Sequence, residues 1–238
     1  MTSPAGDLSQ IAGILFDKDG TLLDFYATWI PKGRALLAKL CDGDVTLMLR
    51  LMSLVGYDMH TNNIISGSIL AAGNNLQIAQ LWAKELKLPV AELEVTINAE
   101  FANATTPPSV AVDNLTVTLQ RLQQMGYILG VATMDSEQGI NTSMASFDCL
   151  HLFDFLAGYD SGYGSKPGPG MVQGFCQVMS LRPEQVMVVG DNTHDMHMGL
   201  SAGAGAVVGV LTGTSAAADL HEADYVLDSI ADLPALLA

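Results

Sequence analysis

The sequence predicts an α/β protein: a doubly wound parallel sheet with an all-α-helical segment inserted into it. Short apolar segments alternate with helical segments over the C-terminal half of the chain, a pattern typical of a parallel sheet with helices on both faces. One more apolar segment stands near the N-terminus. The long stretch between them has helical periodicity and almost no strand signal, so we expect it to be an insertion.

The first strand is followed directly by the insertion. Residues 11–16 form a short apolar run that stops at the polar sequence Asp-Lys-Asp-Gly, which indicates a buried strand ending in a loop. Helical periodicity then runs from about 24 to 104, and glycines and a proline divide it into about four helices. We call residues 24–105 the helical insertion, and we expect residues 1–23 and 106–238 to form the α/β core.

The chain returns to the core through the linker Thr-Thr-Pro-Pro at 105–108. A stripe of Leu115, Leu119 and Leu122 then predicts a helix that ends near Gly126. The remaining strands are expected at 127–134, 155–158, 186–190, 206–211 and 225–227, with helices from about 136, at 170–179 and at 195–204, a short helix before the last strand and a final helix.

The chain is acidic and rich in apolar residues. Of its 238 residues, 10 are Lys or Arg and 25 are Asp or Glu, which gives a formal net charge of -15. Nucleic acids and anionic membranes are bound by clustered basic residues, so neither is an expected partner. An anionic substrate has to be met by a metal ion or by aimed backbone amides, because the overall field repels it.

No segment of the sequence indicates secretion or a membrane. The N-terminus has neither a basic start nor a long apolar stretch, and no apolar run approaches the roughly 18 residues of a membrane span. The three cysteines, Cys41, Cys149 and Cys176, are far apart and odd in number, which favours neither a disulfide framework nor a zinc site. These observations lead us to expect a cytoplasmic protein.

Several polar residues stand where the predicted strands end. Ligands bind at the carboxyl ends of the strands in an open parallel sheet, so these residues are expected to converge on one edge. Clustered carboxylates repel one another and are usually held together by a divalent cation, and an all-oxygen set without Cys or His favours Mg²⁺. The residues are Asp17, Asp19, Gly20, Thr133, Met134, Asp135, Lys166, Asp191, Asn192 and Asp195.

Two of these carboxylates lie two positions apart, at Asp17 and Asp19, in a turn that Gly20 loosens. Both can therefore approach one substrate, where one attacks as a nucleophile and the other moves a proton. Lys166 would supply positive charge for a phosphoryl group. The hydroxyl of Thr133 and the amides around Met134 can donate hydrogen bonds to its oxygens.

Four motifs, in this order along the chain, resemble those of the haloacid dehalogenase superfamily of phosphotransferases. Residues 17–22, Asp-Lys-Asp-Gly-Thr-Leu, resemble the first motif, and Thr133 at a strand end resembles the second. Residues 166–169, Lys-Pro-Gly-Pro, resemble the third, and residues 190–195, Gly-Asp-Asn-Thr-His-Asp, the fourth. The resemblance covers nearly the whole chain, is nearest to phosphoglycolate phosphatase-like members, and implies a Rossmann-like core with a small α-helical cap.

The resemblance implies a Mg²⁺-dependent phosphatase of small phosphorylated metabolites, either phosphoglycolate-like compounds or sugar phosphates. Asp17 would attack the phosphoryl group and form an aspartyl-phosphate. Asp19 would protonate the leaving oxygen and then activate the hydrolytic water. The helical insertion would close over the site and select the substrate.

The resemblance also assigns the groups that bind the metal and the phosphate. Mg²⁺ would be held by Asp17, by Asp191 and by the backbone carbonyl of Asp19. Asp195 and Asn192 would support these ligands without binding the metal directly. The phosphate would be bound by groups at Gly20, Thr133, Met134 and Lys166, and Lys166 also counts among the catalytic residues.

Two other functions stay open. A phosphomutase of the β-phosphoglucomutase type would use the same core and return the phosphoryl group to a second sugar oxygen. The His expected in that branch soon after the first motif is absent, because residues 24–27 read Asp-Phe-Tyr-Ala. A non-catalytic protein that binds phosphorylated metabolites would have lost a motif residue, and all are present. Asp19 excludes haloacid dehalogenases and phosphonatases, which lack this carboxylate.

Some residues allow two interpretations. Lys18 replaces an apolar residue often found between the two aspartates, and it either adds positive charge beside the insertion or faces solvent. Asp135 is either a helix cap or a neighbour of the site. Lys32 and Lys39 are expected to be solvated. Loops near 57–63 and 67–75 contain polar residues and glycines that could face the substrate.

Overall fold

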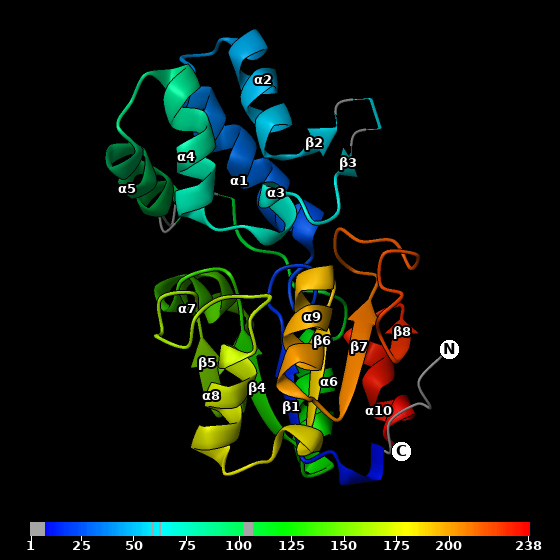
Figure 1. Ribbon diagram of the computed structural model, residues 1–238. Coiled ribbons are helices and arrows are strands. Elements are labelled where there is room, and N and C mark those ends of the chain that lie inside the picture. Colours follow the sequence, from blue (N-terminus) through cyan, green and yellow to red (C-terminus); the bar gives the residue numbers. More distant parts are fainter. Residues whose placement is uncertain (1–7, 59, 62, 102–106) are drawn as a thin grey trace.

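The computed structural model describes residues 8–58, 60–61, 63–101 and 107–238 (Figure 1). Its core is a six-stranded parallel sheet in the order β5-β4-β1-β6-β7-β8, which confirms the predicted doubly wound α/β fold. Each strand lies within its predicted range. The strands are β1 (Gly13–Phe16), β4 (Ile128–Ala132), β5 (Phe155–Ala157), β6 (Val186–Gly190), β7 (Ala206–Val210) and β8 (Tyr225–Leu227).

Helices cover both faces of the sheet because successive strand side chains point to opposite faces. On β1, Ile14 and Phe16 pack with the helices of one face, and Leu15 packs with those of the other. The first face carries α6 (Leu115–Gln124), α7 (Glu137–Met144) and the short C-terminal α10 (Leu233–Leu236). The second face carries α8 (Gly170–Met179) and α9 (Thr193–Ala202).

The helical insertion has its own hydrophobic cluster, which includes Phe25, Leu36, Leu51, Trp82 and Ile97. It lies beyond one edge of the sheet, above the core in Figure 1. Its helices are α1 (Phe25–Leu40), α2 (Val45–Val55), the single turn α3 (Ile69–Ala72), α4 (Asn75–Leu86) and α5 (Val90–Phe101), with β2 (Tyr57–Asp58) and β3 (Asn63–Ile64) as a short antiparallel pair.

That pair of strands departs from the predicted all-helical composition of the insertion. Two residues per strand are too few to produce a visible alternation in the sequence. The helix boundaries follow ordinary capping chemistry: Asp24 accepts a hydrogen bond from the backbone of Ala27 at the start of α1, and Asn74 forms a capping box with Gln77 at the start of α4.

The insertion is joined to the core by two adjacent segments. Leu23 forms an antiparallel bridge with Ala111, and the backbone N–H of Asp24 donates to Val110 O at 2.9 Å. A separate contact joins Ser66 in the insertion to Ser215 in the core, whose hydroxyl oxygens are 2.9 Å apart. The predicted boundary at 106 and the first two residues of the predicted linker at 105–108 lie outside the described residues.

The cysteines Cys41, Cys149 and Cys176 are all buried as free thiols. They belong to three different hydrophobic clusters, so they act as small apolar residues. Among the described residues, every helix is too short or too polar to cross a membrane.

Phe175 on α8 fits against the middle of the sheet because two strands carry glycine there. A Cβ atom added to Gly13 of β1 would lie 2.9 Å from the ring, and one added to Gly130 of β4 would lie 3.0 Å from it. The ring is fully buried and also contacts Phe155 at a centroid distance of 5.5 Å. The missing side chains of two strands therefore make the space that one aromatic ring fills.

We predict that Phe175→Ala lowers the free energy of unfolding by about 3–5 kcal/mol, because it removes a large buried side chain and leaves a cavity that rigid strands cannot fill. Urea denaturation measures the change. The control is Val178→Ala on the same helix, where the side chain is 53% exposed and the expected change is within about 0.5 kcal/mol. Equal losses in the two variants would contradict this account of the packing.

Candidate active site

The central strands bring three of the predicted site residues together. Asp17, Thr133 and Asp191 are the first residues after β1, β4 and β6, which are neighbours in the sheet. Because the strands are parallel, all three residues lie at the same edge, and this edge faces the helical insertion (Figure 1). A cavity opens there, between the core and the insertion, and all three residues line it.

Three buried carboxylates form the centre of the site. Oxygen atoms of Asp17, Asp191 and Asp195 all lie within 4.8 Å of one another. The ammonium group of Lys166 contacts Asp17 and lies 2.6 Å from Asp195. Three carboxylates and one ammonium leave two negative charges without a buried counter-ion in this cluster, which is unfavourable away from water.

The ionisation of these groups reflects that imbalance. Burial raises the pKa of Asp17 to about 6, helped by the charge of Asp195 and opposed by Lys166. Burial, together with the charges of Asp17 and Asp195, raises the pKa of Asp191 well above its usual range. Burial disfavours the charge of Lys166, but Asp17 and Asp195 outweigh it and raise the pKa of this lysine. The protonated lysine is thus stabilised while two of the carboxylates resist ionisation.

The cluster can accommodate a hard divalent cation such as Mg²⁺. Its donors are carboxylate oxygens, without sulfur or imidazole, and its uncompensated charge is negative. The expected ligands Asp17 and Asp191 belong to it. Asp195, which was expected only to support the metal ligands, also places a carboxylate oxygen within 4.8 Å of those of Asp17 and Asp191.

Backbone groups on both sides hold Asp191 in place. The N–H of Thr214 donates to Asp191 Oδ2 at 2.8 Å. A Cβ atom at Gly213 would lie 1.9 Å from this carboxylate, and one at Gly20 would lie 2.5 Å from it, so only glycine allows the approach. The loop after β7 is a part of the site that the sequence analysis missed, although its position at a strand end was a usable signal.

Asp195 and Asn192 are positioned by the start of α9. Asn192 is the N-cap residue: its Oδ1 accepts from the N–H of His194 at 3.2 Å, and its own N–H donates to Asp195 Oδ2 at 3.1 Å. The capping box therefore leaves the other carboxylate oxygen of Asp195 for Lys166. Asn192 Nδ2 is buried without a hydrogen-bond partner and its residue lines the cavity, so this donor is available to a bound group.

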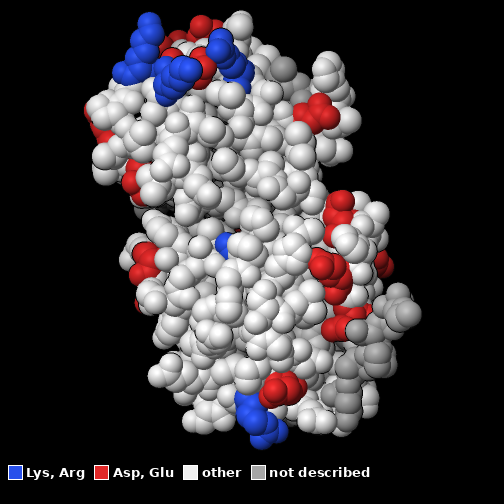
Figure 2. All heavy atoms as spheres, in the orientation of Figure 1, with Lys and Arg blue, Asp and Glu red and all other residues white. Residues whose placement is uncertain are grey.

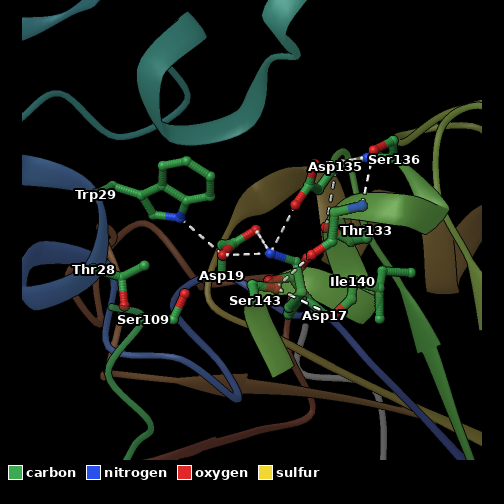
Figure 3. Close-up of polar contacts among 12 residues, drawn as sticks. Asp17, Asp19, Thr28, Trp29, Ser109, Thr133, Asp135, Ser136, Ile140 and Ser143 are labelled. Carbon is green, nitrogen blue, oxygen red and sulfur yellow. Dashed lines mark hydrogen bonds and ion pairs between the residues drawn. The ribbon is translucent and has the colours of Figure 1, made fainter. Parts of the chain in front are cut away.

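The carboxylate of Asp19 is not one of the three clustered ones, and it faces the indole of Trp29 (Figure 3). It accepts a hydrogen bond from Trp29 Nε1 of α1 at 2.8 Å and pairs with Lys18 at 2.8 Å. Burial raises the pKa of Asp19 and the charge of Lys18 opposes the rise. Asp19 thus lines the cavity beside Asp17 but is anchored to the helical insertion by an indole. Trp29 is not among the site residues predicted from the sequence, because no local pattern links it to Asp19.

Lys18 is fully buried and bridges two acidic residues, so the interpretation that it faces solvent is wrong. Its ammonium pairs with Asp135 at 3.0 Å as well as with Asp19, and it lies 5.5 Å from the centre of the Trp29 ring. Burial works against its charge, but both carboxylates raise the pKa of this lysine. Asp135 is a neighbour of the site and not the helix cap: it pairs with Lys18 and lines the cavity. The N-cap of α7 is Ser136, whose side chain accepts from the N–H of Gly139.

The predicted phosphate-binding residues divide into two groups. Thr133, Met134 and Lys166 line the cavity. Gly20 does not: its N–H donates to Leu23 O at 2.8 Å and its carbonyl accepts from Thr212 Oγ1 at 2.7 Å. With both polar groups engaged and a φ of +98°, Gly20 shapes the turn and admits Asp191 rather than offering an amide to phosphate.

The wall of the cavity on the insertion side includes the predicted loop 67–75, of which Ile69 to Asn75 line it. None of the described residues of loop 57–63 does so. The expectation that Lys32 is solvated is wrong: it is 5% exposed, donates to Ser109 Oγ at 3.0 Å and lies 5.2 Å from the Trp29 ring centre. Lys39 is largely exposed and pairs with Glu100.

Comparison with known proteins finds similar sequences and similar folds. A "Phosphoglycolate phosphatase" of Haemophilus influenzae is 33% identical over 126 residues, 52% of this chain and 56% of that protein. "Pyrophosphatase PpaX" of Bacillus mycoides is 32% identical over 123 residues, 51% of this chain and 57% of that protein. The chain therefore matches just over half the length of these curated relatives.

Solved structures match the fold over almost the whole chain. A predicted phosphoglycolate phosphatase from Haemophilus somnus has a TM-score of 0.74 at 22% identity and covers 96% of this chain and 99% of its own. A putative β-phosphoglucomutase from Thermotoga maritima has a TM-score of 0.68 at 16% identity, covering 95% of this chain and 98% of its own. The model of the family of haloacid dehalogenase-like hydrolases matches residues 14–209, and the chain belongs to this family.

Proposed function

We propose that this protein is a Mg²⁺-dependent phosphatase that hydrolyses small phosphorylated metabolites through an aspartyl-phosphate on Asp17. The observation that carries the proposal is the buried cluster of Asp17, Asp191 and Asp195 with Lys166, at the mouth of a cavity and at the ends of the central strands. Family membership and the names of the phosphatase relatives support the same reaction class.

Two carboxylates in different environments suit a two-step reaction. In the first step an oxygen of Asp17 attacks phosphorus, the bond from phosphorus to the alcohol oxygen breaks, and Asp19 gives its proton to that oxygen. In the second step Asp19 takes a proton from water, the water oxygen attacks phosphorus, and the bond to Asp17 breaks to release phosphate. The raised pKa of Asp19 suits a group that must carry a proton at the start.

The surrounding residues bind and orient the phosphoryl group. Lys166 offers a charged donor beside Asp17, and Thr133 and the unpartnered amide of Asn192 offer neutral donors. Asp17 and Asp191, with Asp195 close by, would hold Mg²⁺, whose contribution when bound is to neutralise the charge of the phosphoryl oxygens. Trp29 and Lys18 hold the Asp19 carboxylate in place.

We predict that the protein releases phosphate from phosphomonoesters in the presence of Mg²⁺ but not of EDTA, and that Asp17→Asn lowers kcat by about a thousandfold or more, since it removes the nucleophile. Phosphate release from p-nitrophenyl phosphate, phosphoglycolate and sugar phosphates measures this. Asp113→Asn, at an exposed position before α6, is the matched control and should be fully active. Full activity of Asp17→Asn would overturn the mechanism, and dependence on an added bisphosphate would indicate a phosphomutase.

We predict that, in EDTA, wild-type stability falls relative to that of Asp17→Asn as the pH rises from 5 to 7.5. The pKa of Asp17 is about 6 in the folded protein and near 3.8 when unfolded, so between these values the folded state binds more protons and stability falls with rising pH. The difference between the two proteins should change by roughly 1 kcal/mol over this range. Urea denaturation at both pH values measures it, and a constant difference would contradict the raised pKa.

We predict that Lys18→Met lowers the free energy of unfolding by about 3–5 kcal/mol, because it leaves Asp19 and Asp135 facing each other without a buried cation. Adding Asp135→Asn to this variant should restore part of the loss, since one of the two charges is then removed. Lys39→Met, where the side chain is 60% exposed, is the control and should change little. Thermal and urea denaturation compare the wild type with these three variants and with the single variant Asp135→Asn. If the loss of stability in the double variant equals the sum of the losses in the two single variants, the proposed coupling between Lys18 and Asp135 is refuted.

A further inference from the structure

We propose that the substrate is a phosphomonoester of a largely apolar alcohol, which the helical insertion binds in a hydrocarbon-lined cavity. This inference rests on the proposed phosphatase function and adds the chemical class of the leaving group. It follows from a contrast inside one cavity: the core side is charged and polar, whereas the insertion side is almost entirely apolar.

The apolar side is built from the helices α1 to α5 of the insertion and the loop that follows α3. Its large side chains include Phe25, Ile30, Leu37, Met52, Leu70 and Trp82. They surround a space that is continuous with Asp17, Thr133 and Lys166, so a phosphoryl group held at the core side has its alcohol portion among these side chains.

Besides two indoles, whose N–H groups donate to Asp19 and to Leu51 O, the described insertion contributes two polar side chains to this wall, Asn74 and Asn75. Asn74 Oδ1 accepts from the N–H of Gln77 at 3.0 Å, as the cap of α4. Asn75 Nδ2 donates to Asn98 Oδ1 at 2.7 Å. One polar atom of each amide thus stabilises the wall itself, and the atoms that remain, Asn74 Nδ2 and Asn75 Oδ1, are uncharged.

None of the lysines and arginines in the described part of the insertion lines the cavity. Lys39 and Arg50 pair with Glu100 and Glu85 on the outside, with side chains 60% and 64% exposed. On the face that Figure 2 shows, exposed basic side chains gather at the end of the insertion remote from the core. Lys32, the buried exception, is engaged by Ser109 and the face of Trp29 rather than by the cavity.

This arrangement disfavours a second anionic group on the substrate. The carboxylate of phosphoglycolate, or the second phosphoryl group of pyrophosphate, would lose its water among hydrocarbon without meeting a cation, which is strongly unfavourable. Burial among the same side chains strengthens the binding of an apolar alcohol, by about fourfold in affinity for each methylene group. The relatives named for phosphoglycolate and pyrophosphate therefore share the core chemistry with this chain, while its own wall is suited to a different leaving group.

The first experiment compares two substrates of equal size with opposite chemistry. Isobutyl phosphate and phosphoglycolate both carry four heavy atoms beyond the bridging oxygen, and only the second bears a carboxylate. We expect kcat/KM for isobutyl phosphate to exceed that for phosphoglycolate by at least about tenfold. Along the series from methyl to hexyl phosphate, kcat/KM should rise by about fourfold per methylene until the cavity is filled.

A binding measurement separates the inference from the chemistry. With Mg²⁺ present, isobutylphosphonate should raise the melting temperature more than phosphonoacetate at the same concentration, because neither can be hydrolysed and they differ only in the group that meets the insertion. Stabilisation by isobutylphosphonate without phosphate release from any ester would support the apolar ligand and overturn the phosphatase. Phosphate release that favours phosphoglycolate, with stronger stabilisation by phosphonoacetate, would overturn the apolar ligand and leave the phosphatase standing.

A matched pair of variants tests the wall directly. Leu70→Arg places a cation in the cavity, and it should lower kcat/KM for isobutyl phosphate and raise it for phosphoglycolate. Leu54→Arg adds the same charge on α2 at a side chain that is 42% exposed and outside the cavity, and both substrates should be unaffected. The less disruptive variant Leu70→Ala should lower kcat/KM for hexyl phosphate and leave kcat/KM for methyl phosphate unchanged. Equal effects of the two arginine variants would overturn the assignment of this wall.

Discussion

The contact of Lys166 with Asp17 and Asp195 is the constraint on which the rest of the site depends. Three carboxylates held within a few ångströms of one another, and away from water, repel each other, and a single ammonium group only partly offsets that repulsion. The fold supplies the remaining support. The three central strands fix the starting points of the loops, the capping box of α9 aims Asp195, and the backbone of the loop after β7 donates to Asp191.

A second buried lysine organises the other half of the site. Lys18 draws Asp19 and Asp135 together, so the carboxylate of Asp19 has a different environment from that of Asp17 only two residues away. The hydrogen bond from Trp29 adds a direct contact between this carboxylate and the helical insertion. The position of the insertion and the orientation of Asp19 are thus coupled through one indole. Such a difference in environment is what allows two carboxylates to take different parts in one reaction.

The core and the insertion contribute opposite chemistry to one cavity. The core side presents carboxylates, a lysine and neutral donors, which suit a metal ion and a phosphoryl group. The insertion side presents aromatic and aliphatic side chains, and its described basic residues are either exposed or engaged elsewhere. Solved structures match the fold of this chain over almost their whole length, and in the proposal above it is the side chains of the insertion that select the substrate.

The sequence by itself determined the sheet, its helices and the four groups of residues at the strand ends. Each of these is a local signal. Apolar residues recur with helical periodicity in a helix and form a short run in a buried strand, and polar residues follow the strand ends. The order of the motifs along the chain needs no long-range information. It also determined that the stretch after the first strand would be helical. The two-residue strands of the insertion were not predicted, because so short a segment shows no periodicity.

Only the tertiary structure decided which of these residues act together. Lys32 was expected to be solvated, since a lysine is usually exposed, and for Lys18 exposure to solvent was one of two interpretations. Each is buried because a partner distant in the sequence lies against it: Asp135 for Lys18 and Ser109 for Lys32. The contacts of Trp29 with Asp19, and of Gly213 and Thr214 with Asp191, were likewise not predicted from the sequence. Such contacts join residues that are far apart along the chain, and no periodicity or spacing records them.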